Sequence, residues 1–228
     1  MEAIVLAGGF GTRLREVVPD LPKPMAPIAG RPFLEILLAS LARKGVKRVI
    51  LSLGFMAEKI TAYFGGAFAG MELDYVVEYE PLGTGGAARL AMTHCDVDHV
   101  LVINGDTFLD LEVGSVEAHW QKHRHPIIVG REVLDTARYG RLLITQGQVM
   151  DFAEKGVSGP GSINAGCYVF NRGQLDGFAL NEAFSLEADY LTQAVARMRF
   201  DVFSTLGQFI DIGLPEDYVR AQTDLAGI

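Results

Sequence analysis

A glycine-rich stretch near the start of the chain carries the residue types that bind phosphate. The segment Gly8-Gly9-Phe10-Gly11-Thr12-Arg13 directly follows an apolar run, Ala3 to Leu6, and this order predicts a strand that leads into a phosphate-binding loop. Glycines lack the Cβ atoms that would keep a ligand away from the backbone, and Arg13 adds a permanent positive charge. A tight turn between a strand and a helix would use the same glycines, so the loop alone leaves both interpretations open.

The residues that follow exclude two familiar phosphate-binding patterns. A P-loop requires Gly-Lys-Ser/Thr after four intervening residues, and a dinucleotide-binding fingerprint requires a third glycine where Leu14 stands. Shortly afterwards Lys23 lies between Pro22 and Pro24, whose rings restrict the backbone on both sides of it. A lysine held in this way is a second cation suited to phosphate groups, which favours the phosphate-binding interpretation.

The order Gly-Gly-x-Gly-Thr-Arg-Leu and then Pro-Lys-Pro resembles the signature of the sugar-1-phosphate nucleotidyltransferases. These enzymes join a nucleoside triphosphate to a sugar 1-phosphate and release pyrophosphate. The resemblance implies that Arg13 and Lys23 neutralise the phosphates and contribute to catalysis. It also implies that the loop binds the nucleotide, mainly through its backbone, with the residues Leu6, Ala7, Gly8, Gly9, Gly11 and Thr12.

The composition is typical of a globular protein that acts on small molecules. The chain has 228 residues, 49% hydrophobic and 21% charged, so it can form one substantial core, and we predict a single domain over residues 1–228. The net charge of −8 argues against a nucleic-acid-binding surface. No segment resembles a signal peptide or a membrane span, which predicts a cytoplasmic protein with no membrane partner. Cys95 and Cys167 have no zinc or redox spacing, and we expect reduced structural thiols.

The apolar pattern predicts an alternation of strands and helices after the loop. A helix is expected at 32–44, a strand at 46–53, a helix at 57–63 and a strand at 72–79. This order predicts an α/β fold with a mostly parallel sheet, whose ligands lie beyond the carboxyl ends of the strands. The resemblance implies the Rossmann-like three-layer arrangement of the nucleotide-diphospho-sugar transferase fold. Short apolar runs between residues 126 and 152, separated by turn residues, predict an antiparallel portion on the substrate side.

A second glycine-rich segment, Glu80 to Ala87, precedes a helix expected at 87–92. An ordinary strand-to-helix turn has the same composition. In the nucleotidyltransferases the similar Pro-Leu-Gly-Thr segment lies against the base and sugar of the nucleotide. The resemblance therefore assigns nucleotide binding to Leu82, Gly83 and Thr84, and it leaves the identity of the base open.

Two aspartates are the candidate metal ligands. Asp106 follows a buried strand expected at 99–103, and a carboxylate at that edge is costly unless it is paired or bound to a cation, although it could also cap a helix or lie in solvent. The nucleotidyltransferases have this Gly-Asp at their metal site, so the resemblance implies that Asp106 is catalytic and binds Mg²⁺. Asp211, flanked by Ile210 and Ile212, is the predicted second ligand. Asp110 lies close by and is expected either to be structural or to support the metal ligands without binding the metal itself.

The later part of the chain supplies the candidates for sugar-phosphate binding. By resemblance, Lys155 reaches a phosphate and Glu154 a sugar hydroxyl, although Gly156 stands where family members often have proline. Asn164 lies in an Asn-Ala-Gly segment at the start of a strand and can both donate and accept hydrogen bonds. Glu187, in the first turn of a helix expected at 185–198, is assigned to the sugar by the same resemblance, although a glutamate there also suits the helix dipole.

Two histidines raise the alternative of a zinc site. His119 and His123 lie four residues apart in a helix expected at 113–123. No glutamate follows the first histidine and no third ligand is evident, so a solvated helix end is the favoured interpretation.

Several longer segments are most similar to the D-glycero-α-D-manno-heptose 1-phosphate guanylyltransferases, namely 22–28, 80–87, 104–108, 185–191 and 209–213. They imply GTP and a heptose 1-phosphate as substrates, in the supply of cell-surface glycans such as lipopolysaccharide, capsule or S-layer. Mannose 1-phosphate guanylyltransferases and N-acetylmuramate 1-phosphate uridylyltransferases share most of these positions, and a non-catalytic nucleotide-sugar-binding protein would keep the loops. No hexapeptide repeat follows Ile228, so an acetyltransferase region is not expected. The oligomeric state is not indicated.

Overall fold

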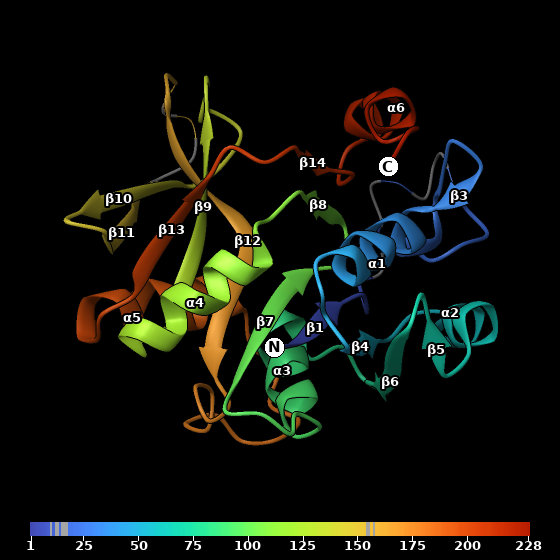
Figure 1. Ribbon diagram of the computed structural model, residues 1–228, viewed down its shortest axis with the longest axis horizontal. Helices are drawn as coiled ribbons and strands as arrows, with labels where there is room; N and C mark the ends of the chain where they lie inside the picture. Colours follow the sequence, from blue (N-terminus) through green and yellow to red (C-terminus); the bar gives the residue numbers. More distant parts are fainter. Residues whose placement is uncertain (10, 12–13, 15–17, 154–155, 157) are drawn as a thin grey trace.

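The computed structural model describes residues 1–9, 11, 14, 18–153, 156 and 158–228. Figure 1 shows the elements along the chain. In order they are β1 (Glu2–Leu6), η1 (Lys23–Met25), β2 (Pro27–Ile28), β3 (Arg31–Pro32), α1 (Phe33–Arg43), β4 (Arg48–Leu53), α2 (Ala57–Phe64), β5 (Ala67–Phe68), β6 (Met71–Val77), α3 (Gly83–Met92), β7 (His99–Asn104), β8 (Thr107–Leu109), α4 (Val113–His123), β9 (Ile127–Val133), β10 (Arg141–Thr145), β11 (Gln148–Ala153), β12 (Gly161–Asn171), η2 (Leu186–Leu191), α5 (Thr192–Arg197), β13 (Asp201–Thr205), β14 (Phe209–Asp211) and α6 (Pro215–Asp224).

The described residues form one ten-stranded sheet in the order β10-β11-β13-β9-β12-β7-β1-β4-β6-β5. Strands β6, β4, β1 and β7 are parallel neighbours, as the βαβαβ order predicted. Beyond β7 the sheet becomes mixed, because β12 runs antiparallel to both β7 and β9, whereas β13 runs parallel to β9. The β10–β11 hairpin lies at one end of the long axis, and α2 with β5 lies at the other (Figure 1).

Both faces of the sheet are covered, which explains the continuous apolar runs of its central strands. In β1, Ala3 and Val5 pack with α1, α2 and α4, whereas Ile4 packs with α3, η2 and α5 on the opposite face. This alternation produces the three layers that the sequence predicted. A third apolar cluster joins α6 to β2, β8 and β14 beside the main sheet.

Two predicted helices differ from the observed ones. Helix α3 begins at Gly83 and not at Ala87, so the second glycine-rich segment is part of its first turn. The helix expected at 185–198 is divided into a π-helical turn, η2, and the short α5. The predicted N-cap is present, since the Ser185 side chain accepts a hydrogen bond from the Ala188 amide at 3.1 Å.

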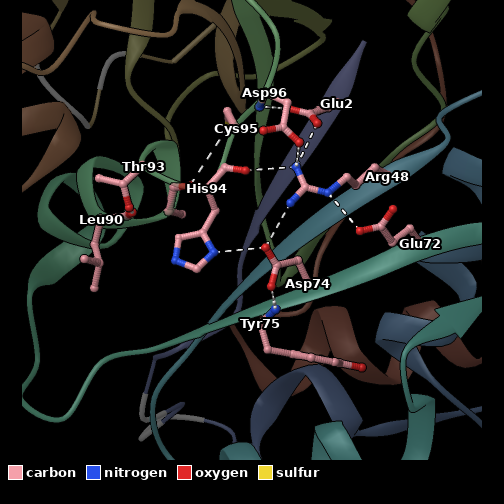
Figure 2. Close-up of polar contacts among 11 residues, drawn as sticks. Glu2, Arg48, Glu72, Asp74, Tyr75, Leu90, Thr93, His94, Cys95 and Asp96 are labelled. Atoms are coloured by element: carbon pink, nitrogen blue, oxygen red, sulfur yellow. Dashed lines mark hydrogen bonds and ion pairs between the residues drawn. The ribbon is translucent and has the colours of Figure 1, made fainter.

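A cluster of ion pairs around Arg48 joins the amino ends of the parallel strands. Figure 2 shows the Arg48 side chain, from the start of β4, among carboxylates of neighbouring segments. Its guanidinium contacts Glu2 of β1 at 2.8 Å, Asp74 and Glu72 of β6 at 3.0 and 3.2 Å, and Asp96 at 3.3 Å. These contacts fix the strands at the end remote from the carboxyl ends, where ligands are expected.

Two further expectations can be compared with the structure. Cys95 and Cys167 are free and buried, and burial raises the pKa of each thiol to about 12, which suits structural thiols. Within the described ranges, no helix has both the length and the apolar character needed to span a bilayer.

Candidate active site

A cavity of about 500 Å³ lies at the carboxyl ends of β1, β4, β6 and β7. Each of these parallel strands ends in a loop at this edge, and such an edge is the usual ligand position in an open α/β sheet. We call it the nucleotide cavity. Of the residues predicted from the sequence, those that line it are Leu6, Ala7, Gly8, Gly9, Lys23, Gly83, Thr84 and Asp106.

The other nucleotide-binding candidates have different positions. Leu82 is buried, with 6% of its surface exposed, and lies behind the cavity wall. Gly11 has a φ of +58°, and a Cβ atom there would lie 2.7 Å from the Cβ of Lys23, so this glycine permits the loop to pass close to the lysine. Thr12 and Arg13 lie outside the described residues.

Glu78 is a cavity residue that sequence reasoning missed. It follows β6, and its Oε2 accepts a hydrogen bond from the Leu82 amide at 2.9 Å. Its Oε1 faces Gly8 and Gly54, and a Cβ atom at Gly54 would lie only 2.9 Å from it. Burial raises the pKa of Glu78, against the opposing effect of the Leu82 amide. The argument used for Asp106, a carboxylate at the end of a buried strand, would have identified it.

Lys23, Asp106 and Asp211 form a cluster of charges at the edge of this cavity. The Lys23 Nζ lies 2.6 Å from Asp106 Oδ2. Strands β8 and β14 are antiparallel, with Asp211 opposite Thr107, and the Ile212 amide donates to the Asp106 carbonyl at 3.0 Å. This short ladder brings the two aspartates together although they are distant in sequence.

The two carboxylates influence each other. Burial raises the pKa of Asp211 and the Asp106 carboxylate raises it further, whereas the Lys23 ammonium lowers it. The described residues contain no group of three or more histidine, cysteine, aspartate or glutamate side chains able to hold a metal. Two adjacent carboxylates nevertheless match the donor set of Mg²⁺, which usually binds one or two protein carboxylates and completes its coordination with water and substrate phosphates.

A second cavity of about 490 Å³, which we call the sugar cavity, adjoins the first. Asn104 lines both cavities, Asp106 lines the nucleotide cavity and Asp211 lines the sugar cavity. Asn164 and Glu187, predicted to bind the sugar, both line the second one. Glu154 and Lys155 lie outside the described residues.

Asn164 holds Glu187 in place. Its Nδ2 donates to Glu187 Oε1 at 3.0 Å and to the Tyr168 hydroxyl at 2.8 Å, and its Oδ1 accepts from the Gly166 amide at 3.1 Å. Burial raises the pKa of Tyr168 well above its usual value, so its hydroxyl stays protonated and donates to Glu187 at 3.3 Å. The Glu187 carboxylate is therefore fixed at the cavity wall.

Arg138 and Tyr139 were not predicted, although both line the sugar cavity. Arg138 contacts Asp217 at 2.5 Å and Glu216 at 3.3 Å, both in α6. Its position depends on a helix about 80 residues later in the chain, so no local pattern could have indicated it.

The two histidines of α4 do not form part of a metal site among the described residues. His119 Nε2 lies 3.1 Å from Asp201 Oδ2, and its ring contacts that of His123. His123 is exposed at the end of α4, as expected, whereas His119 is partly buried against Asp201 and does not belong to a solvated helix end.

Comparison with known proteins identifies the family of the chain. The family model described as "Nucleotidyl transferase" matches residues 2–227. The chain is 40% identical over 226 residues to the D-glycero-alpha-D-manno-heptose 1-phosphate guanylyltransferase of Aneurinibacillus thermoaerophilus, covering 99% of this chain and 98% of that protein. It is 38% identical to the protein of the same name from Campylobacter jejuni, covering 96% and 97%.

Solved structures give the same result. The crystal structure of HddC from Yersinia pseudotuberculosis superposes with a TM-score of 0.87 at 38% identity, covering 97% of each chain. A crystal structure of that protein complexed with GMP-PN gives a TM-score of 0.85 with the same identity and coverage. The full-length family match and these relatives confirm the family inferred from the motifs: the chain belongs to the nucleotidyl transferase family.

Proposed function

We propose that this protein transfers the guanylyl group of GTP to D-glycero-α-D-manno-heptose 1-phosphate and releases pyrophosphate. The observation that carries the proposal is the junction of the two cavities. Asp106 lines one cavity, Asp211 lines the other, and the β8–β14 ladder holds them side by side. A triphosphate in the first cavity and a sugar phosphate in the second would meet at this point. The relatives named for this reaction support the choice of substrates.

The reaction needs little from the protein beyond positioning and neutralisation of charge. An oxygen of the sugar phosphate forms a bond to the α-phosphorus of GTP, and the bond from that phosphorus to the bridging oxygen breaks, so that pyrophosphate leaves with the electron pair. The attacking phosphate is already ionised, and no general base is required. Lys23, held at the junction by Asp106, supplies positive charge where two anions must approach each other.

We further propose that Asp106 and Asp211 hold Mg²⁺. The donor set fits, because two carboxylates lie side by side and the Asp106 charge contributes to the raised pKa of Asp211. When bound, the ion would neutralise phosphate oxygens and stabilise the charge that develops on the leaving group. Arg13, outside the described residues, remains a predicted phosphate-binding residue.

We propose that Glu78 selects guanine. The Watson–Crick edge of guanine presents two neighbouring donors, N1–H and the N2 amino group, which a carboxylate can accept together. Uracil presents one donor between two carbonyl oxygens, and adenine presents an unprotonated ring nitrogen, so both would place acceptors against the carboxylate. Glu78 is half-buried at the cavity wall, where an unpaired acceptor is costly.

Replacement of Glu78 tests this assignment. Glu78→Gln removes the charge at nearly constant shape, and we expect kcat/KM for GTP to fall about tenfold or more while the value for UTP changes little. Glu80→Gln, the same change at an exposed position on the cavity rim, is the matched control and should leave the preference for GTP unchanged. An equal fall in kcat/KM for GTP in both variants would show that the negative charge of the cavity rim matters and that Glu78 makes no specific contact with guanine.

The substrates themselves are tested by pyrophosphate release from the wild-type protein. Four triphosphates combined with heptose 1-phosphate, mannose 1-phosphate and N-acetylmuramate 1-phosphate form the panel. We expect the highest kcat/KM with GTP and heptose 1-phosphate. A preference for mannose 1-phosphate, or for UTP with N-acetylmuramate 1-phosphate, would replace the proposal by one of the two related activities.

We also propose that the protein works in the cytoplasm, in the supply of activated heptose for cell-surface glycans. Its two cysteines are free, as is usual in a reducing compartment.

A further inference from the structure

Three hydrogen bonds join the start of α3 to Phe184 and to the first residue of η2. The Phe184 amide donates to the Leu82 carbonyl and the Gly85 amide donates to the Phe184 carbonyl, both at 3.0 Å. The Leu186 amide donates to the Thr84 hydroxyl oxygen, also at 3.0 Å. Residues about 100 positions apart in the chain therefore lie side by side.

The glycines of this turn permit the close approach. A Cβ atom at Gly83 would lie 2.6 Å from the Phe184 carbonyl oxygen, one at Gly85 would overlap the Phe184 ring, and one at Gly86 would overlap the Glu182 carbonyl. The Phe184 ring is in turn stacked on Phe178, with ring centroids 3.8 Å apart. Thus the glycine-rich segment packs closely against Glu182 and Phe184, and it also borders the nucleotide cavity.

The two sides of this contact belong to different cavities. Thr84 is exposed and lines the nucleotide cavity. Leu186 is buried, with 1% of its surface exposed, and the next residue, Glu187, lines the sugar cavity. The Thr84 hydroxyl thus accepts a hydrogen bond from the residue directly before Glu187.

We propose that Thr84 is a positioning residue that couples nucleotide binding to sugar-phosphate binding through Leu186 and Glu187. A threonine hydroxyl that accepts one hydrogen bond still has its own hydrogen to donate. A nucleotide that accepts this hydrogen fixes the Thr84 rotamer, which holds the Leu186 amide and hence the turn that carries Glu187. The inference rests on the proposed two-substrate reaction and is independent of which base and which sugar are used.

The coupling has a direct consequence for the wild-type protein. If the nucleotide orders the turn that carries Glu187, the sugar 1-phosphate must bind more tightly when a nucleotide is present, and the reverse must hold by the same factor. We would measure the Kd of the sugar 1-phosphate by calorimetry with and without a non-hydrolysable triphosphate analogue. We expect a Kd about fivefold or more lower with the analogue. Equal values would overturn the proposal without any variant.

Thr84→Val removes the hydroxyl at almost constant volume and leaves the buried Leu186 amide without its acceptor. We expect the KM for the sugar 1-phosphate to rise about tenfold, and the KM for the triphosphate to rise by a smaller factor because its hydrogen bond from the Thr84 hydroxyl is lost. Thr84→Ser keeps the hydroxyl and should restore the wild-type KM. A rise in the KM for the triphosphate alone would make Thr84 a simple nucleotide-binding residue and overturn the proposal.

A double-mutant cycle with Glu187→Ala tests the route. If Thr84 acts through Glu187, adding Thr84→Val to Glu187→Ala should change the KM for the sugar 1-phosphate by less than about twofold. If the two substitutions had fully additive effects on the KM for the sugar 1-phosphate, Thr84 would not act through Glu187. All measurements use the substrate pair that the wild type turns over best, so a failure of the guanine or heptose assignment does not alter the outcome.

Discussion

The carboxylates of Asp106 and Asp211 share a small space with one ammonium group, that of Lys23. The pKa of Asp211 is raised first by burial and second by the Asp106 charge, so ionisation of both carboxylates beside Lys23 alone is disfavoured. A divalent cation would complete the balance. A triphosphate that draws Lys23 towards its own oxygens would make this cation still more necessary.

We predict that activity requires Mg²⁺ and that Asp106→Asn or Asp211→Asn lowers kcat by a factor of about one hundred or more with the fold intact. Each variant loses a charged oxygen ligand at nearly constant shape. Asp110→Asn is the matched control, because Asp110 is an exposed aspartate that pairs with Lys44 and lines neither cavity. Pyrophosphate release titrated with Mg²⁺ measures the effect, and turnover near the wild-type rate in either folded variant would exclude the metal assignment.

At Asn164 the structure changes the meaning of a prediction made from the sequence. The amide was expected to bind sugar hydroxyls, but its donors and its acceptor contact Glu187, Tyr168 and Gly166. Asn164 therefore fixes the direction of the Glu187 carboxylate, and we expect it to affect sugar binding mainly through that group.

Asn164→Ala should raise the KM for the sugar 1-phosphate about tenfold and leave the preference for GTP over UTP in place. Asn164→Asp should be worse, because it sets a second carboxylate about 3 Å from Glu187. Asn171→Ala, at the other end of β12, removes an amide that bonds only to Gln174 among the described residues and is the control. The kcat/KM values for GTP and for UTP measure the effect. A changed preference between the two nucleotides would contradict the prediction that Asn164 affects the sugar alone.

At the scale of elements, Asp201 of β13 connects α4 to the sheet through an ion pair with His119. It is buried at the start of β13, with 3% of its side chain exposed, and contacts Arg199 at 2.6 Å, His119 of α4 at 3.1 Å and His125 at 3.5 Å. Burial alone would raise the pKa of Asp201, but the hydrogen bonds from Arg199 and His119 outweigh it and lower the pKa.

A lowered pKa in the folded state makes the contribution of Asp201 depend on pH. The stabilisation is complete above the pKa of the unfolded chain and is lost as the pH falls through the lower pKa of the folded state. Asp201→Asn should therefore cost about 1.5–3 kcal/mol at pH 7, and the difference from wild type should shrink below about pH 4. Urea unfolding at several pH values measures it, with the exposed Asp151→Asn as control. A pH-independent difference would mean that the charge of Asp201 contributes nothing.

Local patterns in the sequence were enough for most elements and for part of the site. The helix expected at 113–123 is observed with the same bounds, because its apolar spacing and its neighbours lie within one segment. The loops at strand ends, with Gly8 and Asp106, followed from the same reasoning. The β8–β14 ladder could not be foreseen, since two three-residue strands separated by about 100 residues leave no periodic pattern.

The same limit explains the glycines of α3. The sequence left open whether the segment with Gly85 and Gly86 is an ordinary turn or a ligand-facing one, and in the structure their closest contacts are Phe184 and Glu182. A glycine in the sequence indicates that a side chain is not tolerated, and only the fold tells which neighbour excludes it.

At the scale of the whole molecule, the two cavities are lined mainly by two successive portions of the chain. The nucleotide cavity is built from residues 6–106, and most of the sugar cavity comes from residues after 106, with Asn104 as the shared wall. Strand β12 joins the portions, hydrogen-bonded to β7 on one side and to β9 on the other. We therefore expect a change of sugar specificity to arise from substitutions in the second portion, with little change in the first.

The position of β12 also has a consequence for the growing chain on the ribosome. Strand β7 is complete at Asn104, but the strand that covers its open edge ends only at Asn171. During synthesis of the residues between them, an apolar strand edge is exposed to other chains, which is the situation that promotes aggregation. Nascent chains arrested at increasing lengths should become resistant to protease only after Asn171 has emerged from the ribosomal tunnel. Resistance of the first portion before β12 appears would mean that β7 needs no partner on that edge, whereas late resistance would make the interval a point at which chaperones are needed.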